Sequence, residues 1–226
     1  MAIGETHAVS GVEEAAAALV ARLRQVGVVP VVELPRAEDA VPLAGALIAG
    51  GLSCVEITLR TPGAVEGIAA IRAAYPEILL GAGTVLSIAQ LETAIAAGAD
   101  FAVAPGTNPE IVRASLARGL PILPGVSTPS EVETAMALGL RTVKLFPAEL
   151  LGGAPYVRAL CGPYREIGFV PTGSITPETL PGYLEIAQVH ACGGSWMVKP
   201  AVIAAADFAA IEQLASAAVR LVGASR

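Results

Sequence analysis

The sequence has few lysines, few aromatic residues and no long apolar run. Only two of its 14 basic residues are lysines, Lys144 and Lys199, and aromatic residues make up 4% of the chain. The net charge is −6 and no basic run occurs, which argues against nucleic acid or an anionic membrane as a partner. No apolar run is long enough to span a bilayer, so we do not expect a membrane protein.

Cysteine is also scarce. Cys54, Cys161 and Cys192 are widely spaced and odd in number, so they indicate neither a disulfide framework nor a metal site. Residues 1–10 lack a basic region followed by an apolar core, so they do not resemble a signal peptide. We therefore expect a cytoplasmic protein that binds no metal.

What the chain does contain suits one globular domain over residues 1–226, because 54% of its residues are apolar. Residues 1–10 are expected to be a loose start. Apolar residues then recur at helical spacing, which predicts an amphipathic leading helix over residues 12–25.

A strand-then-helix unit repeats after this helix, with strand starts 20 to 26 residues apart. The predicted strands are Val28–Val32, Cys54–Leu59, Leu79–Val85, Phe101–Pro105, Pro121–Gly125, Thr142–Pro147, Gly168–Gly173 and Val189–Gly193. The predicted helices are Glu38–Ala49, Ala64–Ala74, Ile88–Ala97, Pro109–Arg118, Pro129–Leu138, Tyr156–Leu160, Pro177–Ile186 and Phe208–Val222.

Helix caps support these boundaries. Thr128 with Glu131 and Ser87 with Gln90 have the spacing of capping boxes. Asn108 and Thr176 each precede a proline, which is typical of a cap followed by the first helical residue. Short buried strands that alternate with helices predict a parallel sheet. Eight such units predict a (β/α)8 TIM barrel with an extra N-terminal helix. A doubly wound open sheet is disfavoured, because no Gly-x-Gly-x-x-Gly follows the first strand.

Lys144 is unusual because it lies within an apolar strand of a chain that rarely uses lysine. Burial disfavours the charged form of an amine. A neutral amine is a nucleophile that can form a Schiff base with a carbonyl. The alternative is a lysine at a strand end whose amine reaches out to water.

Side chains alternate across a strand, so Val55 and Ile57 are predicted to face the helices while Glu56 and Arg60 face the interior. The same alternation turns Lys144 inward, toward Glu56. A structural Glu56–Arg60 ion pair remains one interpretation. The other is a general base beside an arginine that binds an anionic substrate. Glu33, at the end of the first strand, is a weaker candidate acid or base.

Small residues follow several strands. Thr84 and Pro105, after the third and fourth strands, either line a substrate or belong to simple turns. The seventh and eighth strands run into small-residue loops, where such barrels commonly bind phosphate through backbone N–H groups. The alternative is a pair of tight turns. The candidate phosphate residues are Thr172, Gly173, Ser174, Gly193, Gly194 and Ser195. His190 is expected to be a core or surface histidine and Lys199 a solvated lysine. Neither is expected to take part in the site.

In combination, these motifs resemble the class I 2-keto-3-deoxy-6-phosphogluconate aldolases, which overlap with the 4-hydroxy-2-oxoglutarate aldolases. The resemblance runs from Val28 to Pro200. It rests on eight motifs in order: Val29-Pro30-Val31, Val55-Glu56-Ile57-Thr58-Leu59-Arg60-Thr61, Gly81-Ala82-Gly83-Thr84-Val85, Ala104-Pro105-Gly106, Pro124-Gly125-Val126-Ser127-Thr128, Lys144-Leu145-Phe146-Pro147-Ala148-Glu149, Pro171-Thr172-Gly173 and Gly193-Gly194-Ser195-Trp196.

The resemblance implies that Lys144 is the Schiff-base lysine and Glu56 the general acid/base. It places Arg60, Thr84, Pro105 and Phe146 around the pyruvate-like end of the substrate, and Thr172, Gly173 and Ser195 around its phosphate. It also implies a homotrimer and no cofactor. One departure is Ser174, where the family has a second glycine, because serine is costly at a positive φ.

The expected reaction is cleavage of 2-keto-3-deoxy-6-phosphogluconate to pyruvate and glyceraldehyde 3-phosphate, in the Entner–Doudoroff pathway. Other substrates stay open, namely 4-hydroxy-2-oxoglutarate and 2-keto-3-deoxy-6-phosphogalactonate. Outside this class, the alternatives are a non-catalytic phosphosugar-binding barrel and a metal-dependent aldolase or isomerase. The sequence shows no cluster of histidine and acidic ligands for the latter.

Overall fold

The computed structural model describes residues 3–226, with side chains described from residue 11 onward. Its strands, all paired in parallel, form an α/β fold with two sheets, in the orders β5-β4-β3-β2-β1-β9 and β6-β7-β8. The strands are β1 Val28–Val32, β2 Cys54–Thr58, β3 Leu79–Gly83, β4 Phe101–Val103, β5 Ile122–Leu123, β6 Gly125–Val126, β7 Thr142–Leu145, β8 Gly168–Pro171 and β9 Cys192–Gly194.

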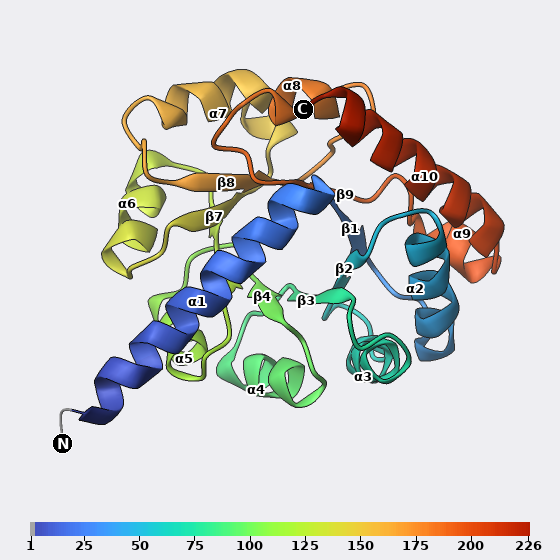
Figure 1. Ribbon diagram of the computed structural model, residues 1–226, viewed down its shortest axis with the longest axis horizontal. Helices are drawn as coiled ribbons and strands as arrows, with labels where there is room; N and C mark the ends of the chain where they lie inside the picture. The colour runs from blue at the N-terminus through green and yellow to red at the C-terminus, as the bar shows by residue number, and fades with distance from the viewer. Residues whose placement is uncertain (1–2) are drawn as a thin grey trace.

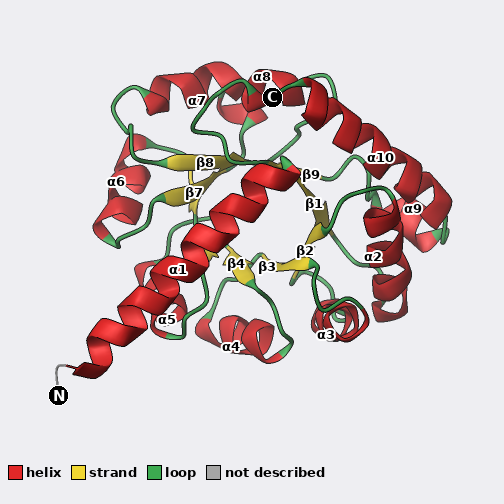
Figure 2. Ribbon diagram, viewed as in Figure 1, coloured by secondary structure: helices red, strands yellow, loops and turns green. Residues whose placement is uncertain are grey.

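Helices connect successive strands and lie outside them, while the strands stand around a common centre (Figure 1). Helix α1 differs, because it crosses the end of this arrangement (Figures 1 and 2). The helices are α1 Ile3–Val26, α2 Ala40–Ala49, α3 Ala64–Ala74, α4 Ile88–Ala96, α5 Pro109–Ala117, α6 Pro129–Ala137, α7 Gly153–Cys161, α8 Leu180–Leu184, α9 Pro200–Ala204 and α10 Phe208–Ala224. Two 3₁₀ turns are η1 Ala37–Asp39 and η2 Glu149–Leu151.

Strand alternation produces two separate apolar cores. The outer core lies between strands and helices and includes Val55, Ile57, Val143 and Leu145. The inner core lies on the other face of the strands and contains Leu19, Leu23, Val29, Cys54, Leu79, Phe101, Val103, Leu123, Val170 and Ala191. Two of these, Leu19 and Leu23, come from α1, so this helix packs against the inner face of the strands.

Most predicted elements agree closely with the structure. Strand β1 and helix α3 have the predicted bounds. The fifth predicted strand is divided into β5 and β6 at Pro124, which has no N–H to donate. Thr128 and Glu131 form the predicted capping box, and Asn108 caps α5. Ser87 caps α4, although the Gln90 side chain accepts from the N–H of Leu86 rather than that of Ser87.

Several predicted boundaries are wrong. The loose start expected over residues 1–10 is helical from Ile3, while residues 1 and 2 lie outside the described part. Helix α8 begins at Leu180 with Thr179 at its N-cap position, and residues 177–179 form a turn, so Thr176 is not the residue that caps it. Helix α9 was not predicted, since five residues are too few for a periodic pattern. Val189 forms only an isolated bridge with Phe169, and β9 begins at Cys192.

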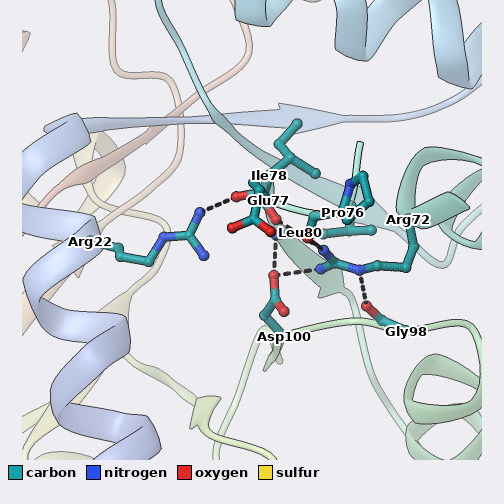
Figure 3. Close-up of polar contacts among 8 residues, drawn as sticks. All are labelled: Arg22, Arg72, Pro76, Glu77, Ile78, Leu80, Gly98 and Asp100. Atoms are coloured by element: carbon teal, nitrogen blue, oxygen red, sulfur yellow. Dashed lines mark hydrogen bonds and ion pairs between the residues drawn. The ribbon is translucent and has the colours of Figure 1, made fainter. Parts of the chain in front are cut away.

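A cluster of polar contacts ties together the N-terminal ends of the strands (Figure 3). The Arg72 guanidinium, on α3, donates to Asp100 Oδ2 at 2.6 Å and to the carbonyls of Gly98 and Pro76. The same Asp100 oxygen accepts from the N–H of Leu80 at 2.8 Å. Arg22, on α1, donates to the carbonyl of Glu77 at 2.7 Å. These contacts fix α1 and α3 to the starts of β3 and β4.

Among residues 3–226, no helix is both long enough and apolar enough to cross a membrane.

Replacing Arg72 by alanine should lower the free energy of unfolding by about 1–3 kcal/mol, because Asp100 and two carbonyls lose a charged donor. Urea denaturation would measure this loss. The control is Arg158→Ala, because Arg158 pairs with Glu185 at 3.0 Å while both side chains are at least half exposed. An exposed pair contributes about 0–1 kcal/mol. Equal losses in the two variants would contradict the assigned role of Arg72.

Candidate active site

Lys144 lies in the middle of β7 with its side chain on the inner face of the strands. Its neighbours Val143 and Leu145 belong to the outer core, so alternation turns Lys144 toward the interior. The backbone N–H of Lys144 donates to the carbonyl of Pro124 at 3.0 Å, which joins β7 to the preceding strand. Only 6% of the residue is exposed. The predicted strand position and direction of Lys144 are confirmed.

Glu56, on β2, meets Lys144 across the interior. Glu56 Oε1 lies 3.7 Å from Lys144 Nζ, and the two side chains are 5% and 7% exposed. This oxygen has no hydrogen-bond partner among the described residues. Gly83, on β3, makes the position possible, because a side chain there would collide with the Glu56 carboxylate. A buried acid and a buried amine compensate each other's charge, so neither is an isolated buried ion.

An aromatic ring completes the surroundings of the amine. Lys144 Nζ lies 5.4 Å from the centre of the Phe146 ring, which is within the range of a cation–π contact. The Ser127 hydroxyl donates to the Phe146 carbonyl at 2.7 Å, and the Tyr156 hydroxyl donates to the Ser127 carbonyl at 2.8 Å. These bonds fix the backbone of Phe146, which follows β7, and thereby the position of its ring.

A cavity of about 220 Å³ opens at the C-terminal ends of the strands. Arg60 lines it and is held from two sides, by a hydrogen bond from its Nε to Thr84 Oγ1 at 3.1 Å and by Glu33 Oε2 at 3.6 Å from its Nη1. Thr84 has φ of 60°, a conformation that is uncommon for residues other than glycine and often marks a functional site. Arg60 pairs with Glu33 here, so the structural Glu56–Arg60 ion pair is not formed.

The loops after β8 and β9 form the opposite wall of this cavity. Thr172, Gly173, Ser174, Gly193 and Ser195 line it. Gly173 and Ser174 have φ of 113° and 58°, so Ser174 does occupy the positive-φ position for which serine is costly. An isolated parallel bridge pairs Thr172 with Gly193, and a side chain at Gly193 would collide with the Thr172 hydroxyl. The two predicted loops are therefore neighbours, brought together by this close contact.

Five predicted site residues do not line this cavity: Lys144 and Glu56, which lie beneath it, and Thr84, Gly194 and Pro105. Thr84 reaches the cavity only through its hydrogen bond with Arg60, and Gly194 is covered by the Trp196 ring. Pro105 lies after β4. Its carbonyl is so close to Gly125 that a side chain at position 125 would collide with that carbonyl. Five further lining residues had no predicted role: Val31, Thr58, Ile175, Val198 and Pro200. Of these, Thr58 shares the inward direction of Glu56 and could have been found by that pattern.

His190 lies away from this site, at the N-terminal ends of the strands. Its ring packs on Gly168, and its Nδ1 is 3.4 Å from the Thr142 hydroxyl. It is buried, which confirms a core histidine. Burial and the charges of Arg24 and Arg226 lower the pKa of His190 to about 4.

This lowered pKa makes stability depend on pH. Between about pH 6.5 and pH 4 the unfolded chain binds a proton at His190 that the folded chain does not, so the free energy of unfolding should decrease as pH falls through that window. Urea denaturation at pH 6.5 and pH 4.5 would measure the decrease. His190→Asn removes the titrating group, so its decrease should be smaller. Equal decreases in both proteins would contradict the expectation.

Fold and site together define an α/β protein with a buried lysine–glutamate pair beneath a cavity lined by an arginine and two small-residue loops. The family model described as "Aldolase: KDPG and KHG aldolase" matches residues 19–214. The chain therefore belongs to the KDPG and KHG aldolase family, as its motifs predicted.

Known proteins of this family resemble the chain over most of its length. The 2-dehydro-3-deoxy-phosphogluconate aldolase of Treponema pallidum is 51% identical over 201 residues, which cover 89% of this chain and 96% of that protein. The KDPG aldolase of Legionella pneumophila, solved with pyruvate captured as a covalent carbinolamine intermediate, has a TM-score of 0.85 at 37% identity, with 88% and 96% covered. The Zymomonas mobilis ZM4 enzyme with 3-phosphoglycerate has a TM-score of 0.81 at 40% identity, with 88% and 93% covered.

Proposed function

We propose that this protein is a class I aldolase that cleaves 2-keto-3-deoxy-6-phosphogluconate to pyruvate and glyceraldehyde 3-phosphate, as a step of the Entner–Doudoroff pathway. The observation that carries the proposal is the Lys144–Glu56 pair, with 3.7 Å between amine and carboxylate inside an otherwise apolar interior. The names of the relatives support the same reaction.

Lys144 is the nucleophile of this mechanism. Its neutral amine attacks the C2 ketone, water leaves, and a protonated imine forms between Nζ and C2. The positively charged imine then draws electrons from the neighbouring C3–C4 bond. This polarisation is supplied by the iminium, so the mechanism uses neither a metal ion nor a cofactor.

Glu56 is the general acid and base. Its carboxylate takes the proton of the C4 hydroxyl, directly or through a water, as the C3–C4 bond breaks. Glyceraldehyde 3-phosphate leaves, and the bonding electrons remain on Lys144 as a pyruvate enamine. Glu56 then returns a proton to the enamine carbon C3, and water releases pyruvate from Nζ. General acid–base catalysis of this kind contributes about 10²–10⁴-fold to a rate.

Residues around the 220 Å³ cavity bind the two charged ends of the substrate. Arg60 neutralises the C1 carboxylate, with Thr84 holding the guanidinium and Phe146 lining the cavity on the pyruvate side. Pro105, which does not line the cavity, is assigned to the same side from the motif it shares with the family. The phosphate lies against the facing loops, whose members are Thr172, Gly173, Ser174, Gly193, Gly194 and Ser195. Backbone N–H groups in such loops form concave anion sites.

The imine is directly testable. Pyruvate and borohydride should give a reduced pyruvyl adduct on Lys144, which peptide mass spectrometry would locate. Lys144→Arg should give no adduct, because a guanidinium stays protonated and is not a nucleophile at neutral pH. An adduct on another residue would refute the assignment of Lys144. No adduct in the unchanged protein would leave the non-catalytic phosphosugar-binding barrel as the better function.

Glu56→Gln separates the acid/base from the nucleophile. This variant should still form some imine with pyruvate while cleavage slows by about 10²–10⁴-fold. Full activity in Glu56→Gln would assign the proton transfer to another group. Glu33→Gln is the comparison variant: Glu33 is half exposed at the rim of the same cavity and pairs with Arg60, so this change should raise KM rather than lower kcat as Glu56→Gln does.

Substrate preference is tested by comparing kcat/KM for phosphorylated and unphosphorylated keto acids. We expect 2-keto-3-deoxy-6-phosphogluconate to exceed 4-hydroxy-2-oxoglutarate, because only the former has a phosphate for the loops after β8 and β9. Ser195→Ala should reduce this ratio. A ratio of one would favour 4-hydroxy-2-oxoglutarate aldolase as the function. 2-Keto-3-deoxy-6-phosphogalactonate, assayed alongside, distinguishes the configuration at C4.

The finer architecture also belongs to this proposal. Residues 1–226 form a single domain in which both sheets close into one (β/α)8 barrel, with α1 as an extra helix. Its support is the bridge between Thr172 and Gly193, which links β8 to β9, and the continuity of β5 and β6 around Pro124.

The protein works in the cytoplasm as a homotrimer. Sedimentation equilibrium would measure the mass of this assembly. Leu150, 82% exposed, is an apolar side chain that such an assembly can cover.

A further inference from the structure

A small cavity of about 10 Å³ lies beside the Lys144–Glu56 pair, which forms part of its lining. Thr172 and Gly193 line both this cavity and the 220 Å³ cavity. The polar side chain of Thr172 therefore lies on the side of the pair that faces the substrate cavity. The remaining walls are apolar and consist of Leu23, Val29, Phe101, Val103, Leu123 and Val170. Of these, only Leu23 comes from a helix, α1. It is 0% exposed.

A second, much larger cavity of about 860 Å³ lies at the opposite end of the strands, beside α1. The strand starts at Ile122, Thr142 and Gly168 line it. Leu123 lines both the large cavity and the small one around the pair. On α1, Leu19 lines the large cavity and Leu23, one helical turn later, lines the small one. These three leucines are therefore the partition between the two cavities.

We infer that Leu23, together with Leu123, is a positioning residue that seals the Lys144–Glu56 pair against water from the N-terminal side. The small cavity has about the volume that one water molecule needs, so it holds no water chain. Glu56 Oε1, which lacks a hydrogen-bond partner among the described residues, would take up any water that entered. With the seal intact, water and protons reach the pair only from the substrate cavity.

The seal has a consequence for the proton held by Glu56, given the proposed function. Glu56 removes a proton from the methyl group of the pyruvate imine to form the enamine, and the reverse step returns it to the same carbon. A carboxylic acid that is shielded from water keeps this proton longer than one in contact with water. Exclusion of water in this way limits proton leakage from a reactive intermediate. With the seal intact, exchange of this proton with solvent is left to the substrate side alone.

Deuterium exchange tests the seal. In D₂O, proton NMR follows deuterium entering the methyl group of pyruvate, and a parallel assay follows aldol addition of pyruvate to glyceraldehyde 3-phosphate. Leu23→Ala should raise the ratio of deuterium entry to aldol addition several-fold, because truncation joins the two cavities and admits water to Glu56. Imine trapping at Lys144 should persist in this variant.

Leu43→Ala is the matched control, because Leu43 is 0% exposed in the outer core, on α2. It loses the same atoms, so it reports general destabilisation and should leave the ratio unchanged. Leu23→Met, which conserves volume, should restore the ratio of the unchanged protein. Leu123→Ala tests the same partition from β5 if Leu23→Ala fails to fold.

Equal ratios in the Leu23→Ala, Leu123→Ala and Leu43→Ala variants would overturn the seal while leaving the aldolase intact. Failure to trap an imine in the unchanged protein would instead overturn the proposed function, so the two failures are distinguishable.

Discussion

The buried contact between Lys144 and Glu56 is the constraint on which the rest of the structure depends. An amine and a carboxylate in an apolar interior are tolerated only when they lie together, here 3.7 Å apart. Their strands, β7 and β2, belong to different sheets, so both sheets must keep their positions for the pair to form. Gly83 provides the space for the carboxylate, and Phe146 covers the amine.

The two ends of the strands have different physical tasks. At the N-terminal ends, Arg72 and Asp100 join α3 to β3 and β4, and α1 packs its leucines into the inner core. At the C-terminal ends, Thr84 and Ser174 adopt positive φ values around an open cavity. Two of the three described non-glycine residues with positive φ therefore lie beside the cavity, and the third, Ala206, follows α9. The opposite end of the strands holds the fold together.

Much of this arrangement was predictable from local patterns. Period-two alternation correctly turned Glu56 and Lys144 inward, and glycine and capping residues marked most helix ends, as at Thr128. The errors occur where local signals are weak or are overruled by packing. Helix α9 is only five residues long, and the start of α8 shifted from Pro177 to Leu180 although the sequence offers a cap at Thr176. Residues 3–10 are helical without the caps or breaks that would have indicated it.

The sequence by itself determined the order of elements, the inward direction of Lys144 and Glu56, and the family. Each of these is read from short motifs, and the residues within one motif are close together in the chain. Only the tertiary structure decided which distant groups meet. It paired Arg60 with Glu33 and Thr84 rather than with Glu56, and it placed Leu23 of α1 beneath the buried pair. These contacts depend on the curvature of the sheets and the crossing of α1, and no local pattern encodes either.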